Sequence, residues 1–194
     1  KKVNHNARLL GVQMEEEVLH DLPQGYSVDE MSSSLNPLGL YGRKLGVRSL
    51  VIVINENRIR NITKAVHQAG YDVPNVFFSS FSSSEVILSD SDKSKGCILI
   101  DIGSQYTSVL IFKDGVLQFL KGVHMGGNNF TNNITDQIGL PFDLAEEIKM
   151  SYGAASEFEQ HPEEEILVKK EDAYVPIKRG IVYQAITPAV EELV

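Results

Sequence analysis

Residues 96–112, GCILIDIGSQYTSVLIF, place two apolar strands on either side of a short polar turn. The first strand ends near Asp101, and the turn contains Gly103. A carboxylate at a strand end, followed by outward-pointing turn amides, suits a Mg²⁺ ion bound through water to a polyphosphate. The alternative is a plain turn, in which Asp101 caps the chain reversal and Gly103 supplies a positive φ.

The hydrophobic periods around this hairpin switch between those of strands and helices, which predicts a mixed α/β chain. A strand at 116–123, reached through the Asp114-Gly115 turn, would complete a meander with strands at 96–102 and 106–113. Other strands are expected at 18–30, 47–55, about 73–80 and in a hairpin at 166–178. Helices are expected at 56–70, 79–92, about 128–138, 143–152 and 180–194.

Two of these helices have a predicted buried face. The helix at 56–70, with Asn55 as N-cap and Gly70 as its C-terminal stop, would bury Ile59, Ile62, Val66 and Ala69. The final helix would bury Ile181, Ala185, Ala189 and Leu193. The segment at 79–92 would carry Phe81, Val86 and Leu88 on a single short helix.

Composition narrows the class of protein. The 194 residues carry a net charge of −8, which argues against a nucleic-acid partner. Cys97 is the single cysteine, so a disulfide framework is excluded and a reducing compartment fits best. The five histidines lack metal-ligand spacing, and no Ser/His/Asp triad can be assembled. Both ends fall inside patterned segments, so we expect the chain to be the middle of a longer protein.

The segment HMGGNNFTNNI at 124–134 is the second candidate binding feature. It places Gly126 and Gly127 at a strand-to-helix junction, with Asn128 or Asn129 as the expected helix cap. Paired glycines let a ligand approach the backbone, and a helix N-terminus favours anions. The alternative is an ordinary loop that leads into a well-capped helix.

The third feature is LAEEIKMSYG at 144–153, where Glu146 and Lys149 are spaced to share a helix face. Together they can hydrogen-bond a ribose or the edge of a purine. The alternative is structural. Asp143 and Glu146 match a capping box, and Lys149 would then be a solvated surface charge.

The order and spacing of the three features resemble the actin-like ATPase superfamily. Within it the chain resembles the FtsA family of bacterial division proteins. The resemblance rests on LHDLPQGYSVDE at 19–30 with NPLGLYGRKLGV at 36–47, on NITKAVHQAGYDVPNVFFSSFSSSEVIL at 61–88, and on AEEIKMSYGAA at 145–155. It implies an actin/Hsp70-like (ribonuclease H-like) domain preceded by an inserted SHS2-like subdomain.

The resemblance also implies a domain layout. Residues 1–78 would form most of the inserted subdomain, and 79–194 would form the actin-like nucleotide-binding region. Within that region, 79–93 would be a return helix of the first domain. The second domain would comprise 94–155 and 181–194, and 156–180 would start its outer lobe.

The same resemblance implies a site and a function. ATP would be bound by Asp101, Gly103, Ser104, Gln105, Gly126, Gly127, Glu146 and Lys149, with Mg²⁺ held by Asp101 through water. The protein would polymerise and would bind the C-terminal tail of FtsZ, and so tether FtsZ to the cell membrane. It would lie in the cytoplasm, at the inner face of that membrane. Other division proteins would contact 1–78, and the membrane would be reached through segments outside this chain.

Two departures from the FtsA pattern bear on the chemistry. Ser104 and Gln105 stand where FtsA proteins usually have glycines, and this form of the turn looks more like PilM, a cytoplasmic scaffold of type IV pilus assembly. Ser84, followed by Glu85, stands where actins carry a glutamine that orients water. The expectation is therefore ATP binding with weak or no hydrolysis. A PilM-like scaffold and an active ATPase or sugar kinase are the alternatives.

Overall fold

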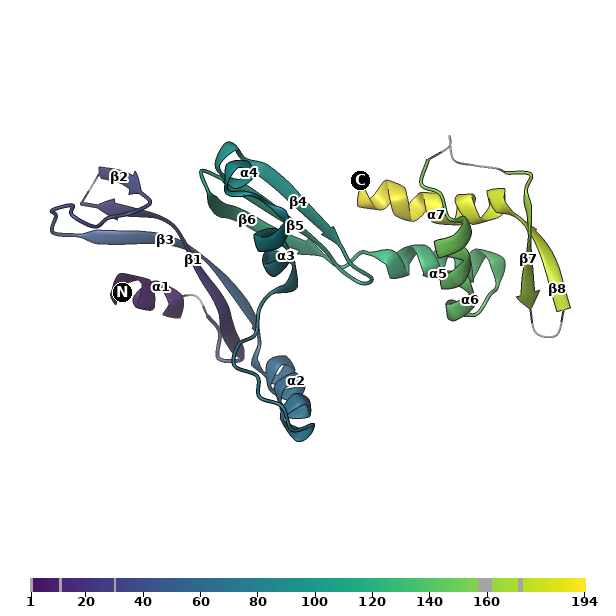
Figure 1. Cartoon of the computed structure of the whole chain (residues 1–194), viewed down its shortest axis with the longest axis horizontal. Coiled ribbons are helices and arrows are strands. Elements are labelled where there is room, and N and C mark those ends of the chain that lie inside the picture. The colour runs from purple at the N-terminus through teal and green to yellow at the C-terminus, as the bar shows by residue number, and fades with distance from the viewer. Residues whose placement is uncertain (1, 11, 30, 157–161, 171–172) are drawn as a thin grey trace. The chain divides into compact units, whose positions relative to one another are not determined.

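The computed structural model describes residues 2–10, 12–29, 31–156, 162–170 and 173–194. It is a mixed α/β structure, as predicted, and it divides into two compact units (Figure 1). Unit 1 comprises Lys1–Ile100 and Ser108–Lys121, and unit 2 comprises Asp101–Thr107 and Gly122–Val194. The described part of the chain has no helix long and apolar enough to span a bilayer.

Unit 1 begins with helix α1 (Lys2–Leu9) and an antiparallel sheet in the order β2-β1-β3. The strands are β1 (Glu16–Val28), β2 (Met31–Ser34) and β3 (Leu45–Asn55), and β1 and β3 pair along almost their whole length. The predicted strands at 18–30 and 47–55 are therefore confirmed. Asp29 (φ 54°) accepts hydrogen bonds from the amides of Arg43 and Lys44, at 2.9 and 2.8 Å, which ties the loop before β3 to the end of β1.

Helix α2 (Glu56–Gln68) begins where predicted, because the Asn55 side chain accepts from the amides of Asn57 and Arg58. Gly70, with φ +88°, lies just beyond its end. Its predicted buried face is only partly correct. Ile59 is buried, whereas Ile62 is 63% exposed, because α2 has little contact with the sheet.

The strand predicted at about 73–80 is wrong. The segment 71–78 has no regular secondary structure, and α3 (Ser79–Ile87) follows it directly. Pro74 lacks an amide hydrogen for a ladder. The Phe78 amide donates instead to the imidazole Nε2 of His20 on β1, at 3.0 Å, so a side chain rather than a neighbouring strand holds this segment.

The single helix predicted at 79–92 is two helices. The chain breaks at Leu88, and Ser89 starts α4 (Asp90–Lys95) with a capping box that it forms with Asp92. Of the three residues expected on that helix, Phe81 and Leu88 pack against the core of unit 1, whereas Val86 is 86% exposed.

The predicted meander is confirmed as a sheet in the order β4-β5-β6. Its strands are β4 (Cys97–Ile102), β5 (Thr107–Lys113) and β6 (Val116–Val123). Asp114 and Gly115 both have positive φ, 55° and 78°, which is typical of a tight two-residue hairpin turn. The core of unit 1 contains Leu110, Phe112 and Leu117, and the division between the units falls within these strands.

Unit 2 contains α5 (Gly127–Ile138), α6 (Phe142–Tyr152), the hairpin β7 (Glu165–Lys170) and β8 (Ala173–Lys178), and α7 (Arg179–Leu193) (Figure 1). The three helices and the hairpin share one core: Ile134, Leu140, Ala145, Ile148, Ile166, Val168, Val182, Ala185 and Ile186. The buried face of α7 is rotated from the prediction. Val182 and Ile186 are buried with Ala185 and Ala189, whereas Ile181 is exposed.

Candidate functional site

The turn between β4 and β5 is closed by a hydrogen bond from the Gly103 amide to the Tyr106 carbonyl, at 2.9 Å. A β-carbon at Gly103 would lie 2.9 Å from that carbonyl oxygen, so glycine is required by crowding and not by a positive φ. Ser104 and Gln105 are exposed at the tip. Their backbone amides donate to no acceptor in the described part of the chain.

Asp101 lies at the end of β4, half-buried. Its carboxylate forms no hydrogen bond or ion pair with the described residues, so both of its oxygens remain available. No cluster of three or more His, Cys, Asp or Glu side chains in the described ranges could hold a metal by itself. A single free carboxylate suits a cation that a polyphosphate and water also ligate.

The same turn holds the start of α5. The amide of Gly127 donates to the Gly103 carbonyl at 2.9 Å, and the amide of Asn128 donates to the Ser104 carbonyl at 2.6 Å. A β-carbon at Gly126 would lie 2.3 Å from the Gly103 oxygen, so only glycine fits there. The first amides of α5, which the sequence suggested for an anion, are therefore already used by the turn.

The expected N-cap at Asn128 or Asn129 is wrong, because both residues lie inside α5. Gly126 occupies the N-cap position, and its amide donates to the side-chain oxygen of Asn129 at 3.0 Å. In a capping box the side chain at the third helical position accepts from the N-cap amide. Asn129 makes this hydrogen bond here, at a position where glutamate or glutamine is more usual.

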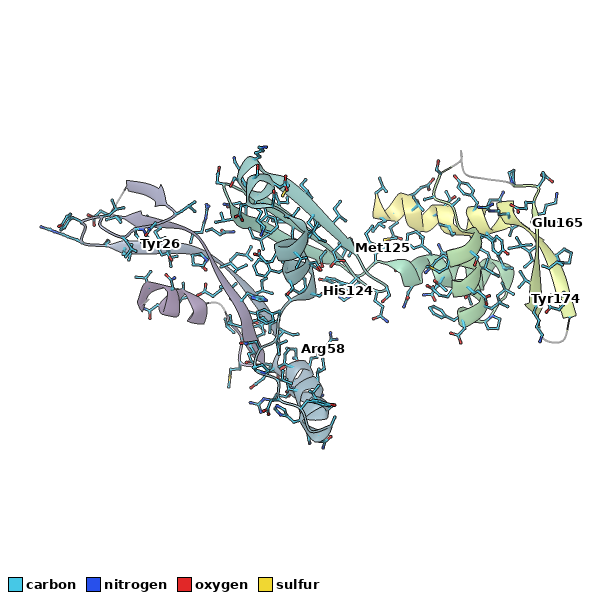
Figure 2. The ribbon with its side chains drawn as sticks, viewed as in Figure 1. Tyr26, Arg58, His124, Met125, Glu165 and Tyr174 are labelled. Atoms are coloured by element: carbon cyan, nitrogen blue, oxygen red, sulfur yellow. The ribbon has the colours of Figure 1, made fainter. Side chains whose placement is uncertain are left out.

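Two further contacts hold the junction that leads into α5, where Figure 2 labels His124 and Met125. The hydroxyl of Thr107, a buried residue, donates to the Met125 carbonyl at 2.7 Å. The ring of Tyr106 meets that of His124 edge to face, with 4.9 Å between centroids. A β-carbon at Gly122 would overlap the Tyr106 ring, so a third glycine also serves this packing.

Glu146 and Lys149 lie together on one face of α6, as their spacing predicted. The Lys149 ammonium donates to Glu146 Oε2 at 2.6 Å, to Thr131 Oγ1 at 3.0 Å and to the Gly127 carbonyl at 3.2 Å. With its side chain only 15% exposed, Lys149 is not the solvated charge of the alternative interpretation. The alternative capping box is also absent, because Pro141 is the N-cap of α6 and no side chain caps it.

The electrostatics of this group favour a charged carboxylate. Hydrogen bonds from Lys149 and then from Thr131 lower the pKa of Glu146 from its ordinary value. All of these contacts reach Oε2, while Oε1 of Glu146 has no partner in the described ranges. Glu146 can therefore accept a further hydrogen bond from a ligand hydroxyl or amine.

Six of the eight predicted site residues come together in unit 2. Contacts through the turn and the start of α5 join Gly103, Ser104, Gly126, Gly127, Glu146 and Lys149. Asp101 and Gln105 belong to the same turn, but their side chains form no hydrogen bond or ion pair with the other six residues in the described part of the chain. Thr131 is the residue that the sequence reasoning missed. Its only sequence signal is its position four residues after Gly127, one helical turn along α5.

Ser84 and Glu85, which stand where actins carry a glutamine, are engaged elsewhere. Ser84 is fully buried, and its hydroxyl donates to the Phe81 carbonyl at 2.6 Å. Glu85 forms an ion pair with buried Lys93 at 2.9 Å. The Ser84 hydroxyl therefore cannot orient a water molecule in this conformation.

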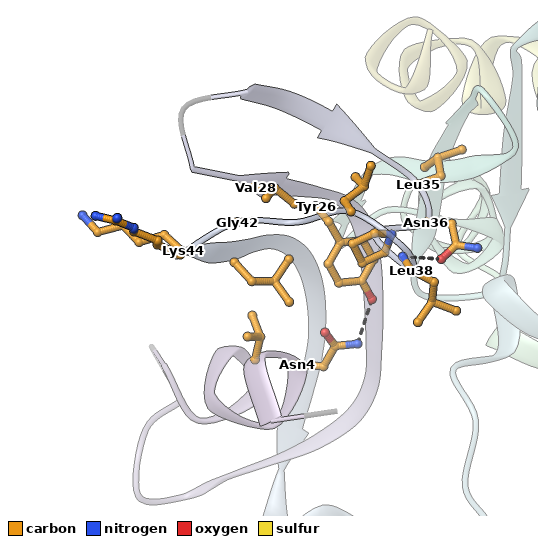
Figure 3. Close-up of a pocket in the computed structure, with 13 residues that line it drawn as sticks. Asn4, Tyr26, Val28, Leu35, Asn36, Leu38, Gly42 and Lys44 are labelled. Atoms are coloured by element: carbon orange, nitrogen blue, oxygen red, sulfur yellow. Dashed lines mark hydrogen bonds between the residues drawn. The ribbon is translucent and has the colours of Figure 1, made fainter.

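A separate recess of about 510 Å³ lies in unit 1, between α1, the end of β1 and the loop that precedes β3 (Figure 3). Asn4 donates to the Tyr26 hydroxyl at 2.9 Å on its wall. Leucines from the loop and the cationic residues Arg43 and Lys44 contribute to the lining, and no acidic side chain is among the described residues that line it. None of the predicted site residues lines it.

Comparison with known families agrees with these features at both ends of the chain. A family model described as "Cell division protein FtsA" matches residues 98–183, and one described as "SHS2 domain inserted in FTSA" matches residues 1–53. The chain belongs to the FtsA family. The predicted resemblance is thereby confirmed, including the inserted SHS2 domain.

Curated FtsA proteins are similar over most of this chain. The division protein FtsA of Buchnera aphidicola (subspecies Baizongia pistaciae) is 34% identical over 172 residues, which cover 89% of this chain and 41% of that protein. FtsA of Escherichia coli K12 is 31% identical over 155 residues, covering 80% and 37%. The chain therefore spans about two fifths of the length of these FtsA relatives.

Solved structures confirm the predicted actin-like fold. A PilM–PilN type IV pilus biogenesis complex matches with a TM-score of 0.65 and 18% identity, covering 97% of this chain and 45% of that one. MreB 5 of Spiroplasma citri bound to AMPPNP matches with a TM-score of 0.58 and 16% identity, covering 72% and 45%. At these identities the likeness concerns the fold alone.

Proposed function

We propose that this FtsA-family chain supplies one wall of a Mg-ATP site in a cell-division scaffold. The observation that carries the proposal is the contact of the β4–β5 turn, the glycine pair at the start of α5 and the Glu146–Lys149 pair within one unit. That the similar MreB structure was solved with AMPPNP supports a nucleotide as the ligand.

Different residues of the site would bind the phosphates, the cation and the ribose of Mg-ATP. Phosphate oxygens would bind the free amides of Ser104 and Gln105, because the Gly127 and Asn128 amides already have acceptors. Asp101 would hold Mg²⁺ through water, and the free Oε1 of Glu146 would accept from a ribose hydroxyl. Lys149, with three acceptors in place, would position Gly127 and Glu146 and would not itself bind phosphate.

The proposed partners follow from the family. The C-terminal tail of FtsZ would bind the outer lobe that starts at 156–180, where a recess of about 450 Å³ lies between α5, α7 and the β7–β8 hairpin. Copies of the protein would associate into filaments. Other division proteins would contact 1–78, where the recess of Figure 3 offers a cationic, leucine-lined surface. The protein would act on the cytoplasmic face of the cell membrane.

Hydrolysis is expected to be slow. With Ser84 turned to the Phe81 carbonyl and Glu85 paired with Lys93, neither side chain supports the water-orienting role of the actin glutamine. Steady phosphate release from MgATP, well above background and unaffected by Glu85→Gln, would contradict this expectation.

The experiment that tests the site compares two aspartates at turns of the same sheet. In the full-length gene product, Asp101→Asn should weaken Mg-dependent binding of a fluorescent ATP analogue at least ~10-fold, because a charged ligand to the cation is lost. Asp114→Asn is the matched control, since asparagine tolerates its positive φ. Equal affinity of Asp101→Asn and wild type would overturn the site assignment.

A PilM-like scaffold is the second candidate, favoured by the coverage of the PilM match and by the Ser104–Thr107 turn. Pull-downs with an FtsZ tail peptide and with a PilN peptide separate the two. Capture by PilN alone would replace the division scaffold by a pilus scaffold and leave the nucleotide site untouched.

A further inference from the structure

Thr131 is one of the few completely buried polar residues of the described chain, at 0% exposure, and it lies at the centre of the group described above. Its hydroxyl lies 3.1 Å from the Gly127 carbonyl, accepts from Lys149 at 3.0 Å and donates to Glu146 Oε2. It thereby touches the α5 start and both charged residues of α6 at once.

Because the buried Thr131 hydroxyl contacts both Glu146 and Lys149, it helps to fix the position of the Glu146 carboxylate. Both hydrogen bonds to Glu146 Oε2 in the described part of the chain come from protein groups, the buried Thr131 hydroxyl and the Lys149 ammonium. The carboxylate is thereby held through one oxygen, with Oε1 unpartnered among the described residues and the side chain still 39% exposed. Fixed acceptors of this kind favour ligand binding because little order has to be created on association.

We propose that Thr131 is a positioning residue of the nucleotide site, whose hydroxyl holds Glu146 and Lys149 as one unit so that Glu146 Oε1 is presented to a ligand hydroxyl. The inference rests on the proposed nucleotide function and adds a residue to it. The hydroxyl group, and not the bulk of the side chain, carries the role.

The charged surroundings of Glu146 make the role measurable through pH. Lys149 is the charged group that contacts it. The other charged side chains of α5, α6 and α7 form no hydrogen bond or ion pair with Glu146 in the described part of the chain: Asp136, Asp143, Glu147, Arg179, Glu191 and Glu192. Because the Thr131 hydrogen bond lowers the pKa of Glu146, removing it moves that pKa upward. Binding that needs the carboxylate is then lost at higher pH as the solution is acidified.

The test uses the full-length protein and titrates MgATP at several pH values. Thr131→Val, which keeps the shape and removes the hydroxyl, should weaken binding about 10-fold at neutral pH and move the acid limb to higher pH. Thr131→Ser should restore both. In a Glu146→Gln background, Thr131→Val should cause little further loss, because the two residues act together.

The outcomes separate this inference from the proposed function. If wild type fails to bind MgATP, the proposed function falls. If wild type binds and Thr131→Val matches it in affinity and pH profile, or Thr131→Ser behaves like Val, the positioning role is overturned while the site stands. Should Thr131→Val fail to fold, Thr131→Cys, of similar volume with a weak S–H donor, takes its place and is expected to be intermediate.

Discussion

The amide of Gly127 donates to the carbonyl of Gly103 across 2.9 Å, so the first turn of α5 is fastened to a turn 24 residues earlier in the chain. The neighbouring bond from Asn128 to Ser104 doubles this attachment. The two glycines at the helix start therefore serve backbone packing first. Any phosphate would meet a junction whose geometry is already set by the protein.

The glycine pair should respond unequally to alanine. In Gly126→Ala the new β-carbon would lie 2.3 Å from the Gly103 oxygen, so the turn must shift, and we expect a loss of about 1–3 kcal/mol in the free energy of unfolding. Gly127→Ala is the control, because its β-carbon would meet the Lys149 ammonium at an ordinary 3.4 Å. Denaturant unfolding measures both. Equal effects would mean that the close approach at Gly126 does not limit substitution.

Removing the Lys149 ammonium should cost stability as well as ligand affinity. Lys149→Met keeps the aliphatic stem but removes one donor from the acceptors on Gly127, Thr131 and Glu146. We expect a loss of about 1–3 kcal/mol in thermal or denaturant unfolding. Lys64→Met, on the exposed face of α2, should change stability by less than about 0.5 kcal/mol. A Lys149→Met protein as stable as wild type would show that this network contributes nothing net.

Gln24, the glutamine of the LPQ segment, should be a structural residue. It is buried, and its amide donates to the carbonyls of Leu117 and Gln118 on β6, both at 2.9 Å. Gln24→Met leaves two carbonyls without this donor, and we expect about 1–3 kcal/mol of destabilisation. Gln68→Met, at the exposed end of α2, is the matched substitution that should be silent. If both variants unfold at the same denaturant concentration, the link from β1 to β6 is dispensable.

His20 should make unit 1 less stable in mild acid. Burial lowers the pKa of His20 from its ordinary 6.5, and its Nε2 accepts the Phe78 amide, which a protonated ring cannot do. Because the unfolded chain takes up the proton first, this stability is fully present above pH 6.5 and falls as the pH drops below it.

The measurement for His20 is unfolding free energy against pH, from about 7.5 to 5. His20→Gln, whose amide oxygen can still accept from Phe78, should flatten the profile in this range. His67→Gln, on exposed α2, should keep the wild-type slope. A His20→Gln profile that overlays wild type would assign the acid sensitivity to other groups.

Local patterns were sufficient for much of the fold. Asn55 as a helix cap, the Asp114-Gly115 turn and the β4–β6 meander depend on neighbours within a few residues, so sequence periodicity predicts them. The shared helix face of Glu146 and Lys149 could likewise be predicted from the sequence, because it depends only on their spacing. A helix places residues three apart on one face, whatever surrounds it.

Tertiary structure decided what those local elements contact. Whether Ile62 or Val86 is buried depends on which element packs against its helix, and the stripe on α7 turned because the α5–α6 pair covers Val182 and Ile186. The segment 71–78 does not form the predicted strand. Its Phe78 amide donates to the side chain of His20, which lies more than fifty residues earlier in the chain.

The candidate site divides in the same way. The sequence by itself determined which groups are candidates for ligand binding: a carboxylate after a strand, a glycine pair before a helix, and an acid–lysine pair one turn apart. Only the fold decided that the helix amides donate to the Gly103 and Ser104 carbonyls, and that Thr131 joins Lys149 to Glu146. Side-chain chemistry is a property of each residue, whereas hydrogen-bond partners from distant segments exist only once packing has excluded water from between them.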